Sequence, residues 1–311
     1  MLIIGAGWIG RQVGLRMAIC GLDVDFIDRA AAMSQAARQW MESAAAGYIE
    51  AILADNARRA PDAVEVAGAA HMTAGVVPIT RQSAAAWHER VRFDPPLDSL
   101  TAQVDVVLEC VPEQITLKRR ILREFSRRFP KTTIIASNSS YFVPSALAQF
   151  VESPERFAHW HFHVPLERSS IVDVSGWEQT EPWVVQRLQR LTLQINQYPL
   201  LLRHEHPGYV FNWLLQSLLR SALELVAKDV VDIADIDRAW KAVSGMPIGP
   251  FAMMDNIGLD VIEQVLANAR WDDAEPVAID KLLAILREPI AQGHLGVKTG
   301  RGFYDHQHDK H

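Results

Sequence analysis

Short apolar runs that alternate with longer amphipathic segments predict an α/β fold over the first two thirds of the chain. The apolar runs are "LII", "VDFID", "VDVVLE", "TTIIAS", "RFAHWHF" and "SIVDVS". Helical patterns fill the intervals, notably residues 31–59, which Pro61 ends, and "EQITLKRRILREFSRRF". Strands that alternate with helices are typical of parallel βαβ units. The pattern therefore predicts a doubly wound sheet with helices on both faces.

The pattern changes near Arg203. From there on, the spacing of polar and apolar residues is typical of helices. A long apolar segment, "YVFNWLLQSLLRSALELVAKD", is followed by "IADIDRAWKAVSG", "FAMMDNIGLDVIEQVLANAR" and "VAIDKLLAILREPIAQG". The interruption at "RHEHPG" predicts two domains, residues 1–203 and an all-helical C-terminal domain, 204–311, for the substrate cleft and dimerisation. These helices are more apolar than one small layer can bury against itself, which favours a homodimer.

Composition and charge exclude several classes of protein. The 311 residues carry a formal net charge of −6, which argues against a nucleic-acid-binding surface and gives no attraction to anionic membranes. No apolar run reaches the roughly 18 residues that a membrane span needs. The N-terminus has no basic region before its apolar stretch, so a signal peptide is not expected and a cytoplasmic protein is. The run Lys118–Arg120 is expected to be a solvated helix face.

The segment Gly5-Ala6-Gly7-Trp8-Ile9-Gly10 fits G-x-G-x-x-G between an apolar strand and a helix. In that context the glycines allow a tight turn, the approach of a pyrophosphate and close helix–strand packing, so a Rossmann-type NAD site is predicted. Asp28 ends the second strand, where a carboxylate binds ribose hydroxyls and repels a 2′-phosphate. Arg29 weakens this preference for NAD over NADP. Only four residues precede Gly5, which leaves a longer natural N-terminus as an open alternative.

Three histidines alternate in "HWHFHVP", at positions 159, 161 and 163. Alternate side chains of a strand share a face, so the three are expected to point the same way. They could hold a metal, move a proton or be ordinary polar residues. A nicotinamide enzyme that acts on an alcohol needs a base near the hydroxyl, usually His, and a carboxylate to orient it.

At this point the chain resembles the 3-hydroxyacyl-CoA dehydrogenase family over nearly its whole length. "LECVPEQITLKRRIL", "IIASNSSYFVPSAL" and the C-terminal segments "GMPIGPFAMMDNIGLD" and "LGVKTGRGFYDH" are similar to family segments. "RFAHWHFHVP" resembles Arg-Phe-x-Gly-x-His-Phe-x-Asn-Pro, and "HPGYVFNWLL" resembles Pro-Gly-Phe-x-x-Asn-Arg. The segments "NSS" and "GYVFN" are most similar to the diketoreductase branch.

The resemblance implies an NAD-dependent oxidoreductase that interconverts 3-hydroxyacyl and 3-ketoacyl compounds. The family's catalytic His falls on His161, and its carboxylate partner falls on Asp173, where Glu is usual. Ser140 and Asn212 would hydrogen-bond the substrate oxygen, and Glu109 matches an acidic position near the cofactor. The implied cofactor contacts are Gly5, Gly7, Trp8, Ile9, Gly10, Asp28, Arg29, Val111, Glu113, Lys118 and Asn138.

Two departures from the family concern the substrate. The family's coenzyme A contacts include a Lys after the second strand, and here no lysine lies between Asp28 and Lys118. The family's Asn in His-Phe-x-Asn-Pro is Val164. A free β-keto or β,δ-diketo acid or ester is therefore the alternative to an acyl-CoA, although Arg58, Arg59 and Arg81 are candidates to meet a phosphate.

Two other classes of function stay open. A metallohydrolase would use the alternating histidines as zinc ligands, but it leaves the dinucleotide turn unexplained. A non-catalytic protein that kept the fold, like some lens crystallins, would not need the complete set of site residues. No metal is therefore predicted, and His159 and His163 are expected to be a surface residue and a pocket-wall residue, respectively.

Overall fold

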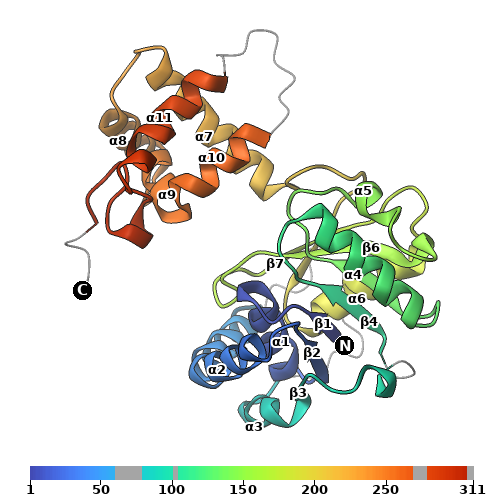
Figure 1. The fold of residues 1–311 in the computed structure, drawn as a ribbon. Helices are drawn as coiled ribbons and strands as arrows, with labels where there is room; N and C mark the ends of the chain where they lie inside the picture. The colour runs from blue at the N-terminus through green and yellow to red at the C-terminus, as the bar shows by residue number, and fades with distance from the viewer. Residues whose placement is uncertain (60–78, 101–103, 269–278, 307–311) are drawn as a thin grey trace. The chain divides into compact units, whose positions relative to one another are not determined.

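The structure is a computed structural model that describes residues 1–59, 79–100, 104–268 and 279–306, without the side chains of 56–59 and 268 (Figure 1). The described chain divides into two compact units, Met1–Tyr209 and Val210–His311. The first is an α/β unit and the second is helical, as the sequence pattern predicts.

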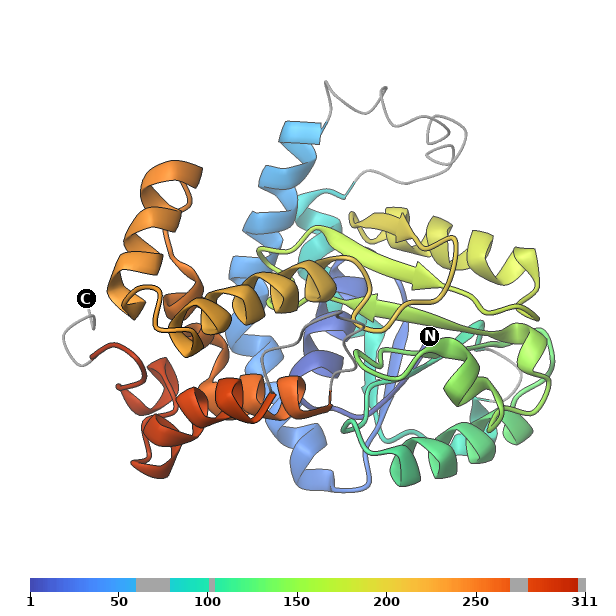
Figure 2. The ribbon, with the colours of Figure 1, turned by 90° about the horizontal axis from the view of Figure 1, so that it is seen from above.

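A single eight-stranded sheet organises the first unit, in the order β3-β2-β1-β4-β5-β6-β7-β8. Figure 2 shows strands of this sheet between helices of the same unit. Its pairs are parallel except for β6 and β7. The strands are β1 (Leu2–Ile4), β2 (Val24–Ile27), β3 (Val91–Phe93), β4 (Val106–Glu109), β5 (Ile134–Ser137), β6 (Phe157–Phe162), β7 (Ile171–Ser175) and β8 (Tyr198–Leu201).

The antiparallel pair β6 and β7 corrects the expectation of parallel βαβ units throughout. Only residues 163–170 connect the two strands, whereas a parallel crossover takes about a dozen residues or more. The chain therefore turns back and pairs β7 directly with β6, so that His161 lies opposite Asp173. The short strands β3 and β8 were not predicted, because "VRF" and "YPLL" are too short and too mixed to show a period.

Helices cover both faces of the sheet because its strands are apolar on both sides. Ile3 belongs to one buried cluster with residues of α1, α2 and α6, whereas its neighbours Leu2 and Ile4 belong to another with residues of α4 and α5. The helices of this unit are α1 (Trp8–Ile19), α2 (Ala31–Arg59), α3 (Arg81–Ala85), α4 (Ile115–Arg128), α5 (Pro144–Ala148) and α6 (Pro182–Gln194). Asp25, the one polar residue within β2, is satisfied by an ion pair with Arg92 of β3 at 2.7 Å.

The second unit contains α7 (Phe211–Ala227), α8 (Ile233–Ser244), α9 (Pro250–Ile257), α10 (Leu259–Asn268) and α11 (Ile279–Ala291). The sequence predicts one helix over residues 251–270, but α9 and α10 are separate because Gly258 has φ +107°, outside helical values. Leu223, Phe251 and Leu282 lie in the core that these helices share. In the part of the chain that the structure describes, no helix has the length and apolarity to cross a bilayer.

Candidate active site

The predicted dinucleotide turn connects β1 to α1. Gly5 has φ +103°, and a Cβ there would lie 2.7 Å from the Cys110 carbonyl oxygen. A Cβ on Gly10 would lie 2.0 Å from the Gly5 carbonyl oxygen, so only glycine lets the helix pack this closely on the turn. A Cβ on Gly7 would meet nothing within 4 Å. The turn therefore leaves open space beside the free N–H groups of a helix N-terminus, which suits a pyrophosphate.

Asp28 follows β2 directly and is fixed against this turn. Its Oδ2 accepts a hydrogen bond of 2.9 Å from Ala6 N, and its Oδ1 accepts one of 3.1 Å from Ala30 N. An ionised carboxylate has about four acceptor sites, so it can also bind ribose hydroxyls. Of the neighbouring predicted contacts, Trp8 is 54% exposed, Arg29 is exposed and Ile9 is partly buried.

An ionic network lies at the end of the next strand, β4, where Lys118 and Glu109 are buried and Glu113 is more exposed. Lys118 Nζ is 2.8 Å from Glu109 Oε1 and 3.1 Å from Glu113 Oε2. Burial lowers the pKa of Lys118, but the two carboxylates outweigh it and raise the pKa overall, so the ammonium group stays charged. Glu113 also accepts hydrogen bonds from the Ser139 hydroxyl and from Tyr141 N.

Two further residues that the sequence predicts as cofactor contacts, Val111 and Asn138, already form hydrogen bonds within the protein. Val111 N donates to Glu109 Oε1 at 2.8 Å, and Asn138 Oδ1 accepts from Phe162 N at 2.8 Å. The first bond is local to the end of β4, whereas the second ties the segment after β5 to the end of β6.

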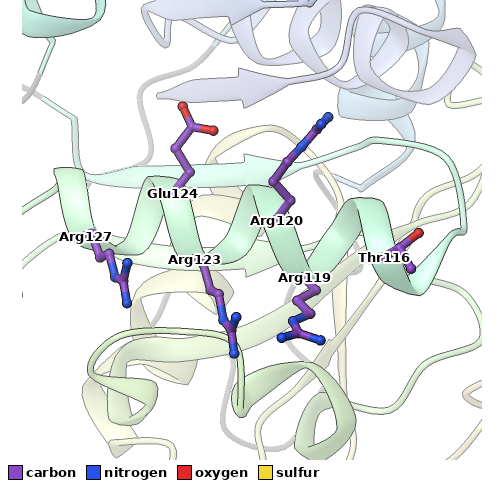
Figure 3. A pocket seen from close by; sticks show the side chains of 6 residues that line it. All are labelled: Thr116, Arg119, Arg120, Arg123, Glu124 and Arg127. Carbon is purple, nitrogen blue, oxygen red and sulfur yellow. The ribbon is translucent and has the colours of Figure 1, made fainter.

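Helix α4 corrects the expectation for the run Lys118–Arg120. Lys118 is only 1% exposed, because it turns inward to the two glutamates, whereas Arg119 and Arg120 lie at the surface. Figure 3 shows Arg119, Arg123 and Arg127 pointing to one side of α4. The run is therefore a solvated face only in part.

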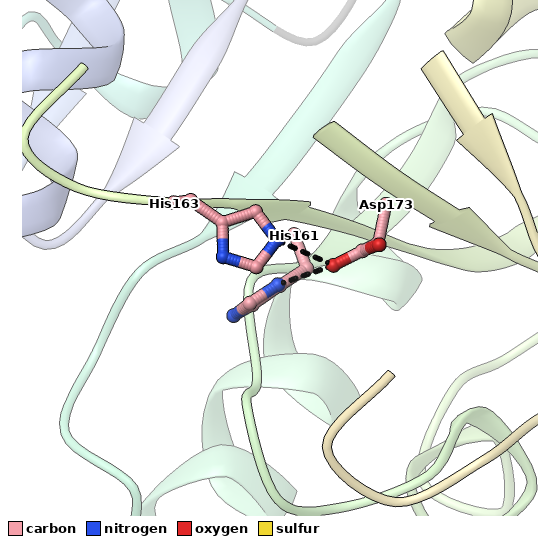
Figure 4. Close-up of side chains that lie close together, drawn as sticks. All are labelled: His161, His163 and Asp173. Atoms are coloured by element: carbon pink, nitrogen blue, oxygen red, sulfur yellow. Dashed lines mark hydrogen bonds and ion pairs between the residues drawn. The ribbon is translucent and has the colours of Figure 1, made fainter. Parts of the chain in front are cut away.

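The acid–base candidates converge between β5, β6 and β7. His161 Nδ1 lies 3.1 Å from Asp173 Oδ2 (Figure 4). His161 Nε2 lies 3.0 Å from Ser140 Oγ. An ionised carboxylate only accepts hydrogen bonds, so a neutral His161 carries its proton on Nδ1 and presents a lone pair on Nε2. The shorter Asp side chain reaches His161 directly, because the register of β6 and β7 places the two residues opposite each other.

Burial and hydrogen bonding together set the charges of this pair. His161 and Asp173 are 3% and 1% exposed. Burial lowers the pKa of His161, and although Asp173 raises it, the net shift is downward. Burial alone would raise the pKa of Asp173, but hydrogen bonds from His161 and His163 outweigh it and the net shift is again downward. The arrangement is a neutral imidazole, able to accept a proton, beside a charged carboxylate.

The expectation that His159 is a surface residue is wrong. His159 is fully buried, and its Nδ1 lies 2.8 Å from the hydroxyl oxygen of Tyr209, which in turn donates to the Ser139 carbonyl at 2.6 Å. The reason is that β6 is an internal strand, covered on both faces. Tyr209 was missed by the sequence analysis, although its ring stacks on that of His161 with centroids 4.4 Å apart. Its signal was the Tyr in "HPGYVFN", where the family motif has Phe.

Asn212 lies in α7, in the second unit, so its place in the site stays a prediction. Arg81 forms an ion pair with Glu50 at the surface. The side chains of Arg58 and Arg59 lie outside the described residues. Val164 packs against the main apolar cluster of the first unit.

Comparisons with known proteins agree along the whole chain. The models of the 3-hydroxyacyl-CoA dehydrogenase NAD binding domain and C-terminal domain match residues 1–205 and 208–306. The 5-formyl-3-hydroxy-2-methylpyridine 4-carboxylate 5-dehydrogenase of Mesorhizobium japonicum is 29% identical over 310 residues, 97% of this chain and 89% of that protein.

Two solved structures are similar over almost the full length of both chains. A diketoreductase, described for its dual catalysis of dicarbonyl compounds, is 30% identical with a TM-score of 0.80, covering 98% of this chain and 97% of that one. The (S)-3-hydroxybutyryl-CoA dehydrogenase of Ralstonia eutropha is 27% identical with a TM-score of 0.78 and the same coverage.

Proposed function

The chain belongs to the 3-hydroxyacyl-CoA dehydrogenase family, and on that premise we propose that it interconverts a 3-hydroxy and a 3-keto compound with His161 and Asp173 as its acid–base pair. The observation that supports this most is the chain of contacts from Ser140 through His161 to Asp173. His161 lies in β6 and Asp173 lies in β7. Both strands belong to the sheet whose strand β1 leads into the dinucleotide turn.

NAD fits the described residues. The glycine turn leaves open space beside Gly7, and Asp28 stands where a ribose would lie. The nicotinamide supplies a hydride acceptor in oxidation and a hydride donor in reduction. Trp8 and Ile9 begin α1 and Arg29 follows Asp28, and Lys118 of α4 is paired with Glu113, which lies between β4 and α4.

The protein's own residues handle the proton. In oxidation, His161 Nε2 accepts the proton of the substrate hydroxyl, and in reduction the same atom returns it. Asp173 stabilises the imidazolium that forms and keeps the ring in the required tautomer. Ser140 Oγ, which bonds His161 Nε2 in the free protein, would bind the substrate oxygen together with Asn212 of the helical domain.

Several observations favour a substrate without coenzyme A. Coenzyme A carries several phosphate charges, for which a site should supply Lys or Arg. Arg81 is already paired with Glu50, and Val164 is apolar where the family has Asn. Among the relatives, one is named for a pyridine carboxylate and another is described with dicarbonyl compounds.

The experiment compares kcat/KM for acetoacetyl-CoA with kcat/KM for a free β-keto ester at one salt concentration. The absorbance of NADH is the readout for both substrates. We expect weak activity with acetoacetyl-CoA and at least equal activity with the ester. An advantage of about a hundredfold for acetoacetyl-CoA, roughly 2.7 kcal/mol of transition-state binding, would contradict this substrate assignment. Absence of NADH turnover with every 3-keto compound would instead favour the non-catalytic alternative.

A further inference from the structure

His163 makes a contact that the proposed acid–base pair does not require. Its Nε2 lies 2.8 Å from Asp173 Oδ2, the same oxygen that His161 Nδ1 approaches at 3.1 Å. Figure 4 shows both rings directed at this one oxygen, from positions two residues apart in the chain. The two rings are edge to face, with centroids 4.8 Å apart.

The protonation states follow from the acceptor. Asp173 is buried with a lowered pKa, so its carboxylate is ionised and can only accept. His163 must therefore donate from Nε2, and His161 from Nδ1. Two donors that share one oxygen each receive less of its electron density than a single donor would, because the negative charge is divided between them.

This second donor is useful because of the shorter carboxylate. Asp is one methylene shorter than the Glu of the family, and its contact with His161 depends on the cross-strand register of β6 and β7. The hydrogen bond from His163 fixes the carboxylate from another direction. It also keeps that carboxylate from holding the proton of His161 too strongly.

We propose that His163 is a positioning residue for the acid–base pair, holding Asp173 in place and moderating its pull on His161 through a shared oxygen. The inference rests on the proposed role of His161. In a site with one histidine, no second imidazole would orient the carboxylate or share its oxygen, and here His163 does both.

The other groups that face His161 do not replace His163. Tyr209 stacks on the ring, and Ser140 occupies Nε2. Glu113 is the remaining charged group that raises the pKa of His161, whereas His163 lowers it. Replacing His163 leaves the attractions of Asp173 and Glu113 in place, so we expect His161 to hold its proton more strongly.

The test compares His163→Phe, which cannot donate, with His163→Gln, which retains a side-chain N–H. The readout is the pH dependence of kcat/KM for oxidation of the 3-hydroxy substrate, which requires neutral His161. We expect His163→Phe to move the acidic midpoint upward by about half to one pH unit, the size of one hydrogen bond's net effect. His163→Gln should shift it less. His88→Gln, at an exposed position, serves as the control and should leave the profile unchanged.

A merely structural role would lower activity at every pH without moving the midpoint, and that result would overturn the proposal. A downward shift in His163→Phe would do the same. A second measurement uses the unaltered protein: ¹⁵N NMR of its histidines should show neutral His163 with the proton on Nε2 and neutral His161 with the proton on Nδ1. A proton on Nδ1 of His163 would refute the shared-oxygen arrangement. These spectra do not depend on turnover, so failure of the proposed reaction and failure of this inference are distinguishable.

Discussion

At the scale of single residues, chemistry depends on which atom of His161 faces which neighbour. Asp173 holds Nδ1 and thereby leaves Nε2 as the proton acceptor, next to the Ser140 hydroxyl. Burial lowers the pKa of His161, which favours the neutral form that oxidation needs. The same residue type two positions earlier, His159, is buried against Tyr209 and serves packing and hydrogen bonding. Residue identity alone therefore does not distinguish the three histidines.

Replacing His161 with Gln should remove most of the activity. General acid–base catalysis contributes roughly 10²–10⁴-fold, so kcat should fall by that order while NADH binding is retained. Steady-state kinetics and a fluorescence titration with NADH measure the two quantities. If His163→Gln produced a comparable loss and His161→Gln stayed active, the assignment of the base would be reversed.

Asp28 should determine the choice of cofactor. Its carboxylate is held at the turn by Ala6 N and Ala30 N, where a 2′-phosphate would be repelled. Direct titration should therefore show tighter binding of NADH than of NADPH, and Asp28→Asn should reduce the difference. Tighter binding of NADPH by the unaltered protein would contradict this role.

At the scale of elements, the contact between α1 and the sheet illustrates how glycine decides packing. Gly14 faces the sheet, and a Cβ there would lie 2.1 Å from Cζ of Phe26, which is fully buried. Gly47, in α2, is exposed, and a Cβ there would meet nothing within 4 Å. Both glycines lie inside helices, yet only one is required by its surroundings.

The pair Gly14→Ala and Gly47→Ala should therefore have opposite effects on stability. Overpacking costs roughly 1–3 kcal/mol, so Gly14→Ala should lower the free energy of unfolding by that amount. Gly47→Ala should raise it by about 0.5–1 kcal/mol, because alanine is the better helix former. Urea denaturation of both variants measures this. Equal effects of the two substitutions would show that α1 does not pack on β2 as described.

At the scale of the whole molecule, each of the two units contributes different residues to the function that we propose. The first carries the dinucleotide turn, the acid–base pair and the sheet that orients both. The second carries Asn212 and a set of apolar side chains at its surface: Leu214 is 63% exposed, Val230 61% and Val243 90%. Exposed apolar side chains on one unit favour association with a second copy.

We expect a homodimer formed through the helical unit to dissociate when charge is placed at these exposed apolar positions. Val243→Asp and Leu214→Asp, combined, should convert the dimer to a monomer in light scattering, because an unpaired carboxylate is costly to bury. Lys131→Asp, on an exposed position of the first unit, is the control and should stay dimeric. A monomeric unaltered protein would refute the dimer, and an unaffected double variant would place its interface elsewhere.

The sequence by itself determined the features that depend on local order. The strand, glycine turn and helix of the dinucleotide site, the alternation of elements, the helical character of the second unit and the family motifs around His161 and Asp173 are all readable over short windows. A period of two or 3.6 and a turn that only glycine can make are properties of neighbouring residues.

The tertiary structure decided which side chains meet. The antiparallel turn of β7 back onto β6, the two histidines on one oxygen of Asp173, the stacking of Tyr209 on His161 and the burial of Lys118 between two glutamates all bring together separated positions. Register selects the pairing of His161 with Asp173, because a one-residue shift of β7 would turn its side chains to the opposite face. Local patterns carry no information on which elements cover a strand or a helix, which explains why His159 and Lys118 were expected at the surface and lie in the interior.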